Sequence, residues 1–149
     1  MDGVTIVSDD SPKVLLVQPV DSHDMEELET EADYLRHNSP LPFRLVAMRV
    51  NKWNEELTPW PAPPVFGKTP FGDGAQATLD KIIGLINEQS PFPCDNGQAH
   101  GDLSRVVLGG YSLAGLFALW AGTRQPFGAI VSASPSVWYK DWLGYAETH

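Results

Sequence analysis

The most informative stretch of the sequence runs Arg105-Val106-Val107-Leu108-Gly109-Gly110-Tyr111-Ser112-Leu113-Ala114-Gly115. Its apolar first part predicts a buried strand over 105–111, and the apolar residues that follow predict a helix over 113–124. Gly110 and Ala114, the residues two positions either side of Ser112, are both small. A serine at a strand-to-helix turn between small residues is typical of a turn that presents a nucleophile above a sheet.

Such a turn serves the chemistry of a serine nucleophile. A hydroxyl attacks poorly until a base removes its proton and nearby donors stabilise the oxyanion. The turn exposes the serine oxygen and directs backbone N–H groups toward the substrate carbonyl. Ala114 replaces the second glycine of the strict G-x-S-x-G pattern but remains small. The alternative is an ordinary capping serine in a glycine-rich turn, against which the flanking strand and helix argue.

The rest of the chain alternates strands with helices. Apolar runs predict further strands over 14–20, 43–50 and about 128–132, and periodic apolar residues predict helices over 22–37 and 74–89. Strands that alternate with helices indicate a parallel sheet with right-handed crossovers. We therefore expect a single α/β domain over residues 1–149, with a parallel sheet of about four strands and helices on both faces.

Residues 51–73 interrupt this alternation. Their prolines remove backbone donors and predict a loop without regular structure; they stand at positions 59, 61, 63, 64 and 70. The aromatic residues Trp53, Trp60, Phe66 and Phe71 favour an ordered loop that packs on the domain. Two interpretations stay open for it, a structural cover and a pocket wall.

Composition excludes several classes of protein. A net charge of −9 argues against nucleic-acid binding, which needs a basic surface. The sequence contains no run of roughly 20 apolar residues of the kind that spans a membrane. Met1 to Thr5 lack the features of a signal peptide, so we expect a cytoplasmic protein. The single Cys94 forms no internal disulfide, and its loop-like surroundings make a catalytic role improbable.

Two segments carry a family resemblance. They are Gly109-Gly110-Tyr111-Ser112-Leu113-Ala114-Gly115-Leu116-Phe117-Ala118-Leu119-Trp120-Ala121 and Ser132-Ala133-Ser134-Pro135-Ser136-Val137-Trp138. Both resemble the esterase family that groups esterase D-like and siderophore esterase-like members of the α/β-hydrolases. Residues 20–24, 53–60 and 62–67 are similar, more weakly, to segments of uncharacterised bacterial members.

This resemblance implies a serine ester hydrolase. Ser112 corresponds to the nucleophile, and the backbone N–H of Leu113 to one oxyanion donor. The second donor is expected in the backbone around Val20 and Asp21. The resemblance also implies a small-molecule ester or thioester as substrate, and neither a metal ion nor an organic cofactor. The side chains expected near the substrate are those of His23, Tyr111, Trp53 and Trp138.

The other two members of a catalytic triad are missing from the pattern. In α/β-hydrolases the acid and then the histidine follow the serine, each after a later strand. Asp141, Glu147 and His149 follow Ser112, but no further strand is predicted to place them. We interpret His149 as a frayed end, His37 as a helix C-terminal charge and His100 as a loop residue.

The chain therefore resembles the N-terminal and central part of the fold, a truncated α/β-hydrolase. The alternative function is a non-catalytic module that binds a ligand or partner through the loop rich in Trp and Pro. A fold that ends after its fourth strand exposes a sheet edge, so we also expect self-association through that edge.

Overall fold

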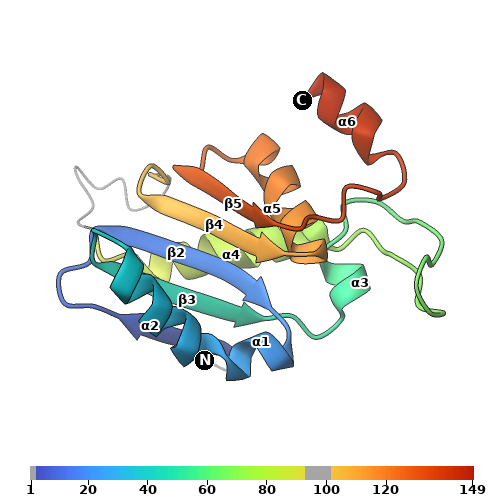
Figure 1. Ribbon diagram of the computed structural model, residues 1–149. Helices are drawn as coiled ribbons and strands as arrows, with labels where there is room; N and C mark the ends of the chain where they lie inside the picture. Colours follow the sequence, from blue (N-terminus) through green and yellow to red (C-terminus); the bar gives the residue numbers. More distant parts are fainter. Residues whose placement is uncertain (1–2, 93–101) are drawn as a thin grey trace.

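The computed structural model describes residues 3–92 and 102–149, so Cys94 and His100 lie outside the described residues. Its centre is a five-stranded sheet in the order β1-β3-β2-β4-β5 (Figure 1). The strands are β1 (Val4–Ser8), β2 (Val14–Val20), β3 (Phe43–Arg49), β4 (Val106–Tyr111) and β5 (Ala129–Ala133). Strands β3, β2, β4 and β5 are parallel neighbours, which confirms the predicted parallel sheet.

The fifth strand, β1, is absent from the sequence prediction. It pairs antiparallel with β3, with Ile6 opposite Val46. The burial of its five residues alternates only weakly along the strand, and Ile6 is 42% exposed. A short edge strand buries little apolar surface, so its sequence carries little of the periodicity that identifies a strand.

The helix predicted over 22–37 is broken into α1 (Ser22–Glu26) and α2 (Leu28–Asn38). Asp21 caps α1, and its carboxylate accepts a hydrogen bond of 2.7 Å from the N–H of Asp24. Glu27 separates the two helices with a non-helical ψ of 6°. The break leaves Leu28 and Ala32 buried against the sheet.

Helices cover both faces of the sheet, as predicted, and each face has its own core. On one face α4 (Ala75–Gln89) and α5 (Leu113–Arg124) bury the side chains of Val106 and Leu108. On the other face α2 covers Leu45 and Ala47 of β3. Figure 1 shows α2 and α4 on opposite sides of the sheet.

The loop over 51–73 is more regular than predicted. It contains a short helix, α3 (Trp53–Glu56), and an isolated bridge between Ala62 and Phe71. The prediction failed because prolines exclude regular structure only at their own positions, and α3 precedes the first of them. The buried hydroxyl of Thr58 donates to the carbonyl oxygen of Asn54 at 2.7 Å or that of Gly72 at 2.8 Å.

The loop is fastened to the segment after β5, which ends in a helix that the sequence did not predict, α6 (Trp142–Thr148). The indole N–H of Trp60 donates to the carbonyl oxygen of Lys140 at 2.8 Å. The buried Tyr139 hydroxyl donates to the carbonyl oxygen of Trp60. These contacts show that the loop is ordered and packs on the domain, as its aromatic residues indicated. None of the helices in the described residues is long and apolar enough to cross a membrane.

Candidate active site

Ser112 occupies a strained turn between β4 and α5. Its φ of 59° and ψ of −117° lie outside the regions that a residue with a side chain ordinarily adopts. Such conformations cost about 1–3 kcal/mol and cluster at functional sites. The residue is half-buried, and its position at the end of a strand is the one predicted for a nucleophile elbow.

The small residues around Ser112 are required by close backbone packing. A Cβ on Gly110 would lie 2.1 Å from the carbonyl oxygen of Ala114. A Cβ on Gly115 would lie 2.9 Å from Ser132 Oγ and 3.1 Å from Pro135 Cα. Ala114 is itself fully buried, so its methyl group fits where the strict pattern has glycine. The spacing of small residues read from the sequence thus has a direct steric cause.

The segment after β5 braces this turn. The N–H of Ser112 donates to the carbonyl oxygen of Ala133 at 3.0 Å, and the N–H of Ser136 donates to that of Ser112 at 3.1 Å. Ser132 Oγ donates to the carbonyl oxygen of Gly115 at 2.9 Å. These bracing roles of Ser132 and Ser136 were missed by sequence reasoning, although the regular spacing of serines over 132–136 was noted.

The predicted oxyanion donors lie at one edge of the sheet. Because β2 and β4 are parallel neighbours, their carboxyl ends place Asp21 and Ser112 at the same edge. Leu113 is the first residue of α5, so its N–H has no partner within the helix. Among the described residues, neither the N–H of Leu113 nor the N–H of Asp21 donates a hydrogen bond. The carbonyl of Val20 accepts from the N–H of Val50 at 2.8 Å.

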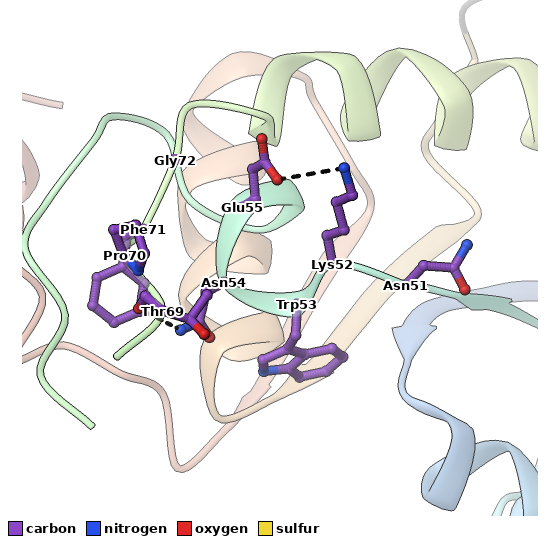
Figure 2. A pocket seen from close by; sticks show the side chains of 9 residues that line it. All are labelled: Asn51, Lys52, Trp53, Asn54, Glu55, Thr69, Pro70, Phe71 and Gly72. Carbon is purple, nitrogen blue, oxygen red and sulfur yellow. Dashed lines mark hydrogen bonds and ion pairs between the residues drawn. The ribbon is translucent and has the colours of Figure 1, made fainter. Parts of the chain in front are cut away.

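The four side chains predicted near the substrate are dispersed. Trp53 lines a pocket of about 550 Å³ together with Asn51, Lys52, Asn54 and residues 69–72 (Figure 2). Tyr111 lines a different groove, on the face of the sheet that α2 covers. His23 and Trp138 line neither cavity. These four side chains therefore share neither cavity, and their place near a substrate stays a prediction.

Trp138 instead belongs to an aromatic cluster that joins the 51–73 loop to the segment after β5. Its ring packs edge-on against Phe66, with centroids 5.5 Å apart, and lies 5.9 Å from Phe71. Phe71 in turn contacts Tyr139 edge-on at 5.1 Å. Burial raises the pKa of the Tyr139 hydroxyl, so this residue is neutral and acts as a structural donor.

Solved structures of esterases have a similar fold. The siderophore hydrolase EstA from Aspergillus nidulans is 23% identical, with a TM-score of 0.66 over 97% of this chain and 56% of its own. An IroE-like serine hydrolase from Shewanella oneidensis is 20% identical, with a TM-score of 0.68 over 97% of this chain and 50% of its own.

The enterobactin esterase FES from Shigella flexneri is 22% identical, with a TM-score of 0.56 over 92% of this chain and 33% of its own. The chain has the α/β-hydrolase fold of these esterases. It spans about half the length of the first two structures. No family model and no curated protein matches the sequence.

No histidine among the described residues forms a hydrogen bond with Ser112. His23 pairs with Glu27 at 3.6 Å, and His37 Nδ1 contacts the carbonyl oxygen of Asp33 at 2.7 Å. His37 lies in the last turn of α2, as predicted. His149 is exposed, follows the last residue of α6 and stacks on Tyr145 with centroids 4.0 Å apart. Asp141 and Glu147 are exposed, at the start and near the end of α6.

A pair of carboxylates, Asp21 and Asp24, flanks the expected oxyanion site. Burial raises the pKa of Asp24, and the neighbouring charge of Asp21 raises it further. The N-cap hydrogen bond from Asp24 to Asp21 holds the carboxylate of Asp21 against α1. The side chain of Asp21 therefore has a structural role as the N-cap, and only its backbone N–H is expected to serve as an oxyanion donor.

Proposed function

We propose that this chain carries the nucleophile and the oxyanion donors of a serine carboxylic-ester hydrolase. The observation that supports this most directly is the backbone of Ser112, held at a φ of 59° between β4 and α5. A capping serine has no need of that conformation, because an N-cap residue normally has an extended backbone. The likeness to esterase structures supports the same assignment.

In the proposed reaction Ser112 Oγ attacks the acyl carbon of an ester as a base takes the hydroxyl proton. The carbonyl π electrons move onto its oxygen, where the N–H groups of Leu113 and Asp21 stabilise the charge. The ester C–O bond then breaks, the alcohol leaves with the proton, and water releases the acid from Ser112. The base lies outside the described residues.

The proposed substrate is a small-molecule ester or thioester. The similar structures include siderophore hydrolases and an enterobactin esterase, which supports esters of the siderophore type. The cytoplasmic location expected from the sequence also stays a prediction.

Covalent labelling with a fluorophosphonate probe tests this proposal. The proposal requires a base outside the described residues to reach Ser112, so the wild-type chain should be labelled, Ser112→Ala should not, and Ser104→Ala should be labelled like wild type. Ser104 is a matched control because it is exposed and, among the described residues, forms hydrogen bonds to Asp102 alone. A folded wild-type protein that resists labelling would contradict an activated nucleophile.

The second candidate is a binding module without turnover. It is favoured by one observation, that the described histidines contact Glu27, Asp33 and Tyr145 and make no hydrogen bond to Ser112. In that case the ordered loop over 51–73 and its pocket at Trp53 would bind a ligand. Absence of labelling together with saturable quenching of Trp fluorescence by an ester ligand would favour this candidate.

Self-association through the edge of β5 is a further expectation. In the described sheet β5 has a neighbour, β4, on one side alone. An open strand edge pairs readily with another chain. Sedimentation velocity should therefore show dimers whose fraction rises with concentration, and a single monomeric species at all concentrations would contradict this expectation.

A further inference from the structure

The backbone of Ser112 is held mainly by a segment outside its own helix. Its N–H donates to the carbonyl oxygen of Ala133 at 3.0 Å, and its carbonyl oxygen accepts from the N–H of Ser136 at 3.1 Å. The same carbonyl oxygen also accepts from the N–H of Leu116, inside α5, at 3.1 Å. A residue with a φ of 59° keeps that conformation only where its surroundings over-determine it. Two of these three bonds come from the segment after β5.

Residues 134–141 depend on side chains for their place on the sheet. The N–H of Tyr139 donates to the carbonyl oxygen of Ser136 at 3.1 Å and closes a turn over residues 136–139. Apart from the bond between Ser136 and Ser112, the described backbone-to-backbone hydrogen bonds of residues 134–141 stay within the segment or run to α6. The turn that holds Ser112 therefore needs an anchor of another kind.

Tyr139 supplies that anchor. Its side chain is 2% exposed, and its hydroxyl donates to the carbonyl oxygen of Trp60. Its ring packs edge-on against Phe71 with centroids 5.1 Å apart and lies 5.9 Å from the ring of Trp60. Trp60 and Phe71 both belong to the loop over 51–73, and Phe71 is itself buried. A continuous set of contacts thus joins the loop, through Tyr139, to the turn that holds Ser112.

We propose that Tyr139 is a positioning residue for the nucleophile. Held by the 51–73 loop, it fixes the turn over 136–139, and the N–H of Ser136 then fixes the carbonyl group of Ser112. The inference rests on the proposed function for its effect on chemistry, but its effect on the backbone of Ser112 needs no turnover. It gives the loop a role in the geometry of the nucleophile, beyond that of a cover or a pocket wall.

Tyr139→Phe tests this role, because it removes the hydroxyl bond to Trp60 and keeps the ring. The matched control is Tyr145→Phe. The ring of Tyr145 also packs on Trp60, at 5.5 Å, and its hydroxyl is hydrogen-bonded to that of Thr123 at 2.6 Å. No hydrogen bond among the described residues joins Tyr145 to the segment over 133–139.

The first measurement is a double-mutant cycle in urea. Ser112→Gly relieves the positive φ, so it should raise the urea midpoint in the wild-type and Tyr145→Phe backgrounds. In the Tyr139→Phe background the strain is already partly released, and the rise should be about half as large or smaller. Phe71→Leu removes the edge-on ring and should give the same reduction, so it replaces Tyr139→Phe if that variant does not fold.

The second measurement is the rate of fluorophosphonate labelling at saturating probe. Tyr139→Phe should lower this maximal rate by about tenfold, because a misplaced nucleophile slows the chemical step. The probe concentration that gives half the maximal rate should not change, since binding of the probe is unaffected. Tyr145→Phe should be labelled at the wild-type rate.

Three results would overturn the inference. One is the same midpoint shift from Ser112→Gly in every background, whatever its sign. Another is an equal change of that shift in Tyr139→Phe and Tyr145→Phe. The third is a labelled wild type whose maximal rate Tyr139→Phe leaves unchanged. An unlabelled wild-type chain would contradict the proposed function, and the urea cycle would then decide the role of Tyr139 by itself.

Discussion

The two faces of β4 differ in how completely they are packed. Val106 and Leu108 face α4 and α5 and are buried to 1% and 0% exposure. Val107 and Tyr111, on the other face of the same strand, border an open groove. The elbow at Ser112 depends on the packed face, because α5 starts there. The difference shows that the turn at Ser112 is tightly packed on one face of the sheet while the other face of the same strand stays partly open.

The tightest contact on the packed face should give the largest effect on stability. Gly110→Ala would place a Cβ 2.1 Å from the carbonyl oxygen of Ala114, so strand and helix must separate. We expect a loss of about 4 kcal/mol or more in the free energy of unfolding, measured with urea. The control is Gly84→Ala in α4, where a Cβ meets nothing within 4 Å, and this variant should gain about 0.5–1 kcal/mol. Equal stability of the two variants would contradict the steric account of the elbow.

A pair of truncations measures the two faces of β4 directly. Leu108→Ala should cost about 2–5 kcal/mol in the free energy of unfolding, because it leaves a cavity among α4 and α5. Val107→Ala, on the groove side, should cost less than about 1 kcal/mol, since its side chain is only half-buried. Urea titration of both variants at one pH provides the comparison, and similar losses would mean that the groove face is packed in solution.

The strain at Ser112 predicts an opposition between stability and chemistry. Ser112→Gly relieves the unfavourable φ of 59° and should raise the free energy of unfolding by about 1 kcal/mol. The same variant should lose all fluorophosphonate labelling. Ser136→Gly serves as a comparison on the bracing segment and should not be stabilising, because Ser136 is buried without a positive φ. A destabilised Ser112→Gly would show that the turn stores no strain.

The elbow could be predicted from the sequence because all of its causes are local. Gly110, Ser112 and Ala114 lie within one turn, and the strand and helix beside them are apolar and periodic. The four parallel strands were predictable for the same reason. The helix predicted over 22–37 was wrong at Glu27, where docking of Leu28 on the sheet overrides helical periodicity.

The remaining features depend on contacts between distant segments. The bracing of Ser112 by Ser136 and the bond between Tyr139 and Trp60 join residues that no short-range pattern relates. Grouping Trp53, Tyr111 and Trp138 into one pocket required the loop over 51–73 to be placed in space. Periodicity carries no such information. In the structure Trp53 and Tyr111 line different cavities, and Trp138 contacts Phe71, which lines the cavity of Trp53.

The smallest expected effect is a pH-dependent change in stability, which allows the two edges of the sheet to be compared. At the β1 edge, just after that strand, the Asp9 carboxylate accepts a bond from the N–H of Phe43 at 3.0 Å and another from Arg36 at 3.0 Å. The Phe43 bond, and then Arg36, lower the pKa of Asp9 below 3.8. A carboxylate whose pKa is lowered in the folded state stabilises the protein at pH values above its unfolded pKa. This stabilisation is lost as the pH falls through the folded pKa. Because Asp9 is partly exposed, the gain at pH 7 should be no more than about 1 kcal/mol.

Asp9→Asn tests this contribution. The variant should be less stable than wild type at pH 7 by that amount, and the difference should shrink as pH falls below 3.8. Asp10→Asn is the matched control, since Asp10 is a neighbouring carboxylate without a hydrogen bond or ion pair among the described residues. If the stability difference for Asp9→Asn stays constant with pH, the effect comes from altered hydrogen-bond geometry and not from the charge of Asp9. A difference that vanishes in acid would mean that the charge of Asp9 holds the end of β1 against β3 and α2, whereas no ion pair among the described residues does so at β5.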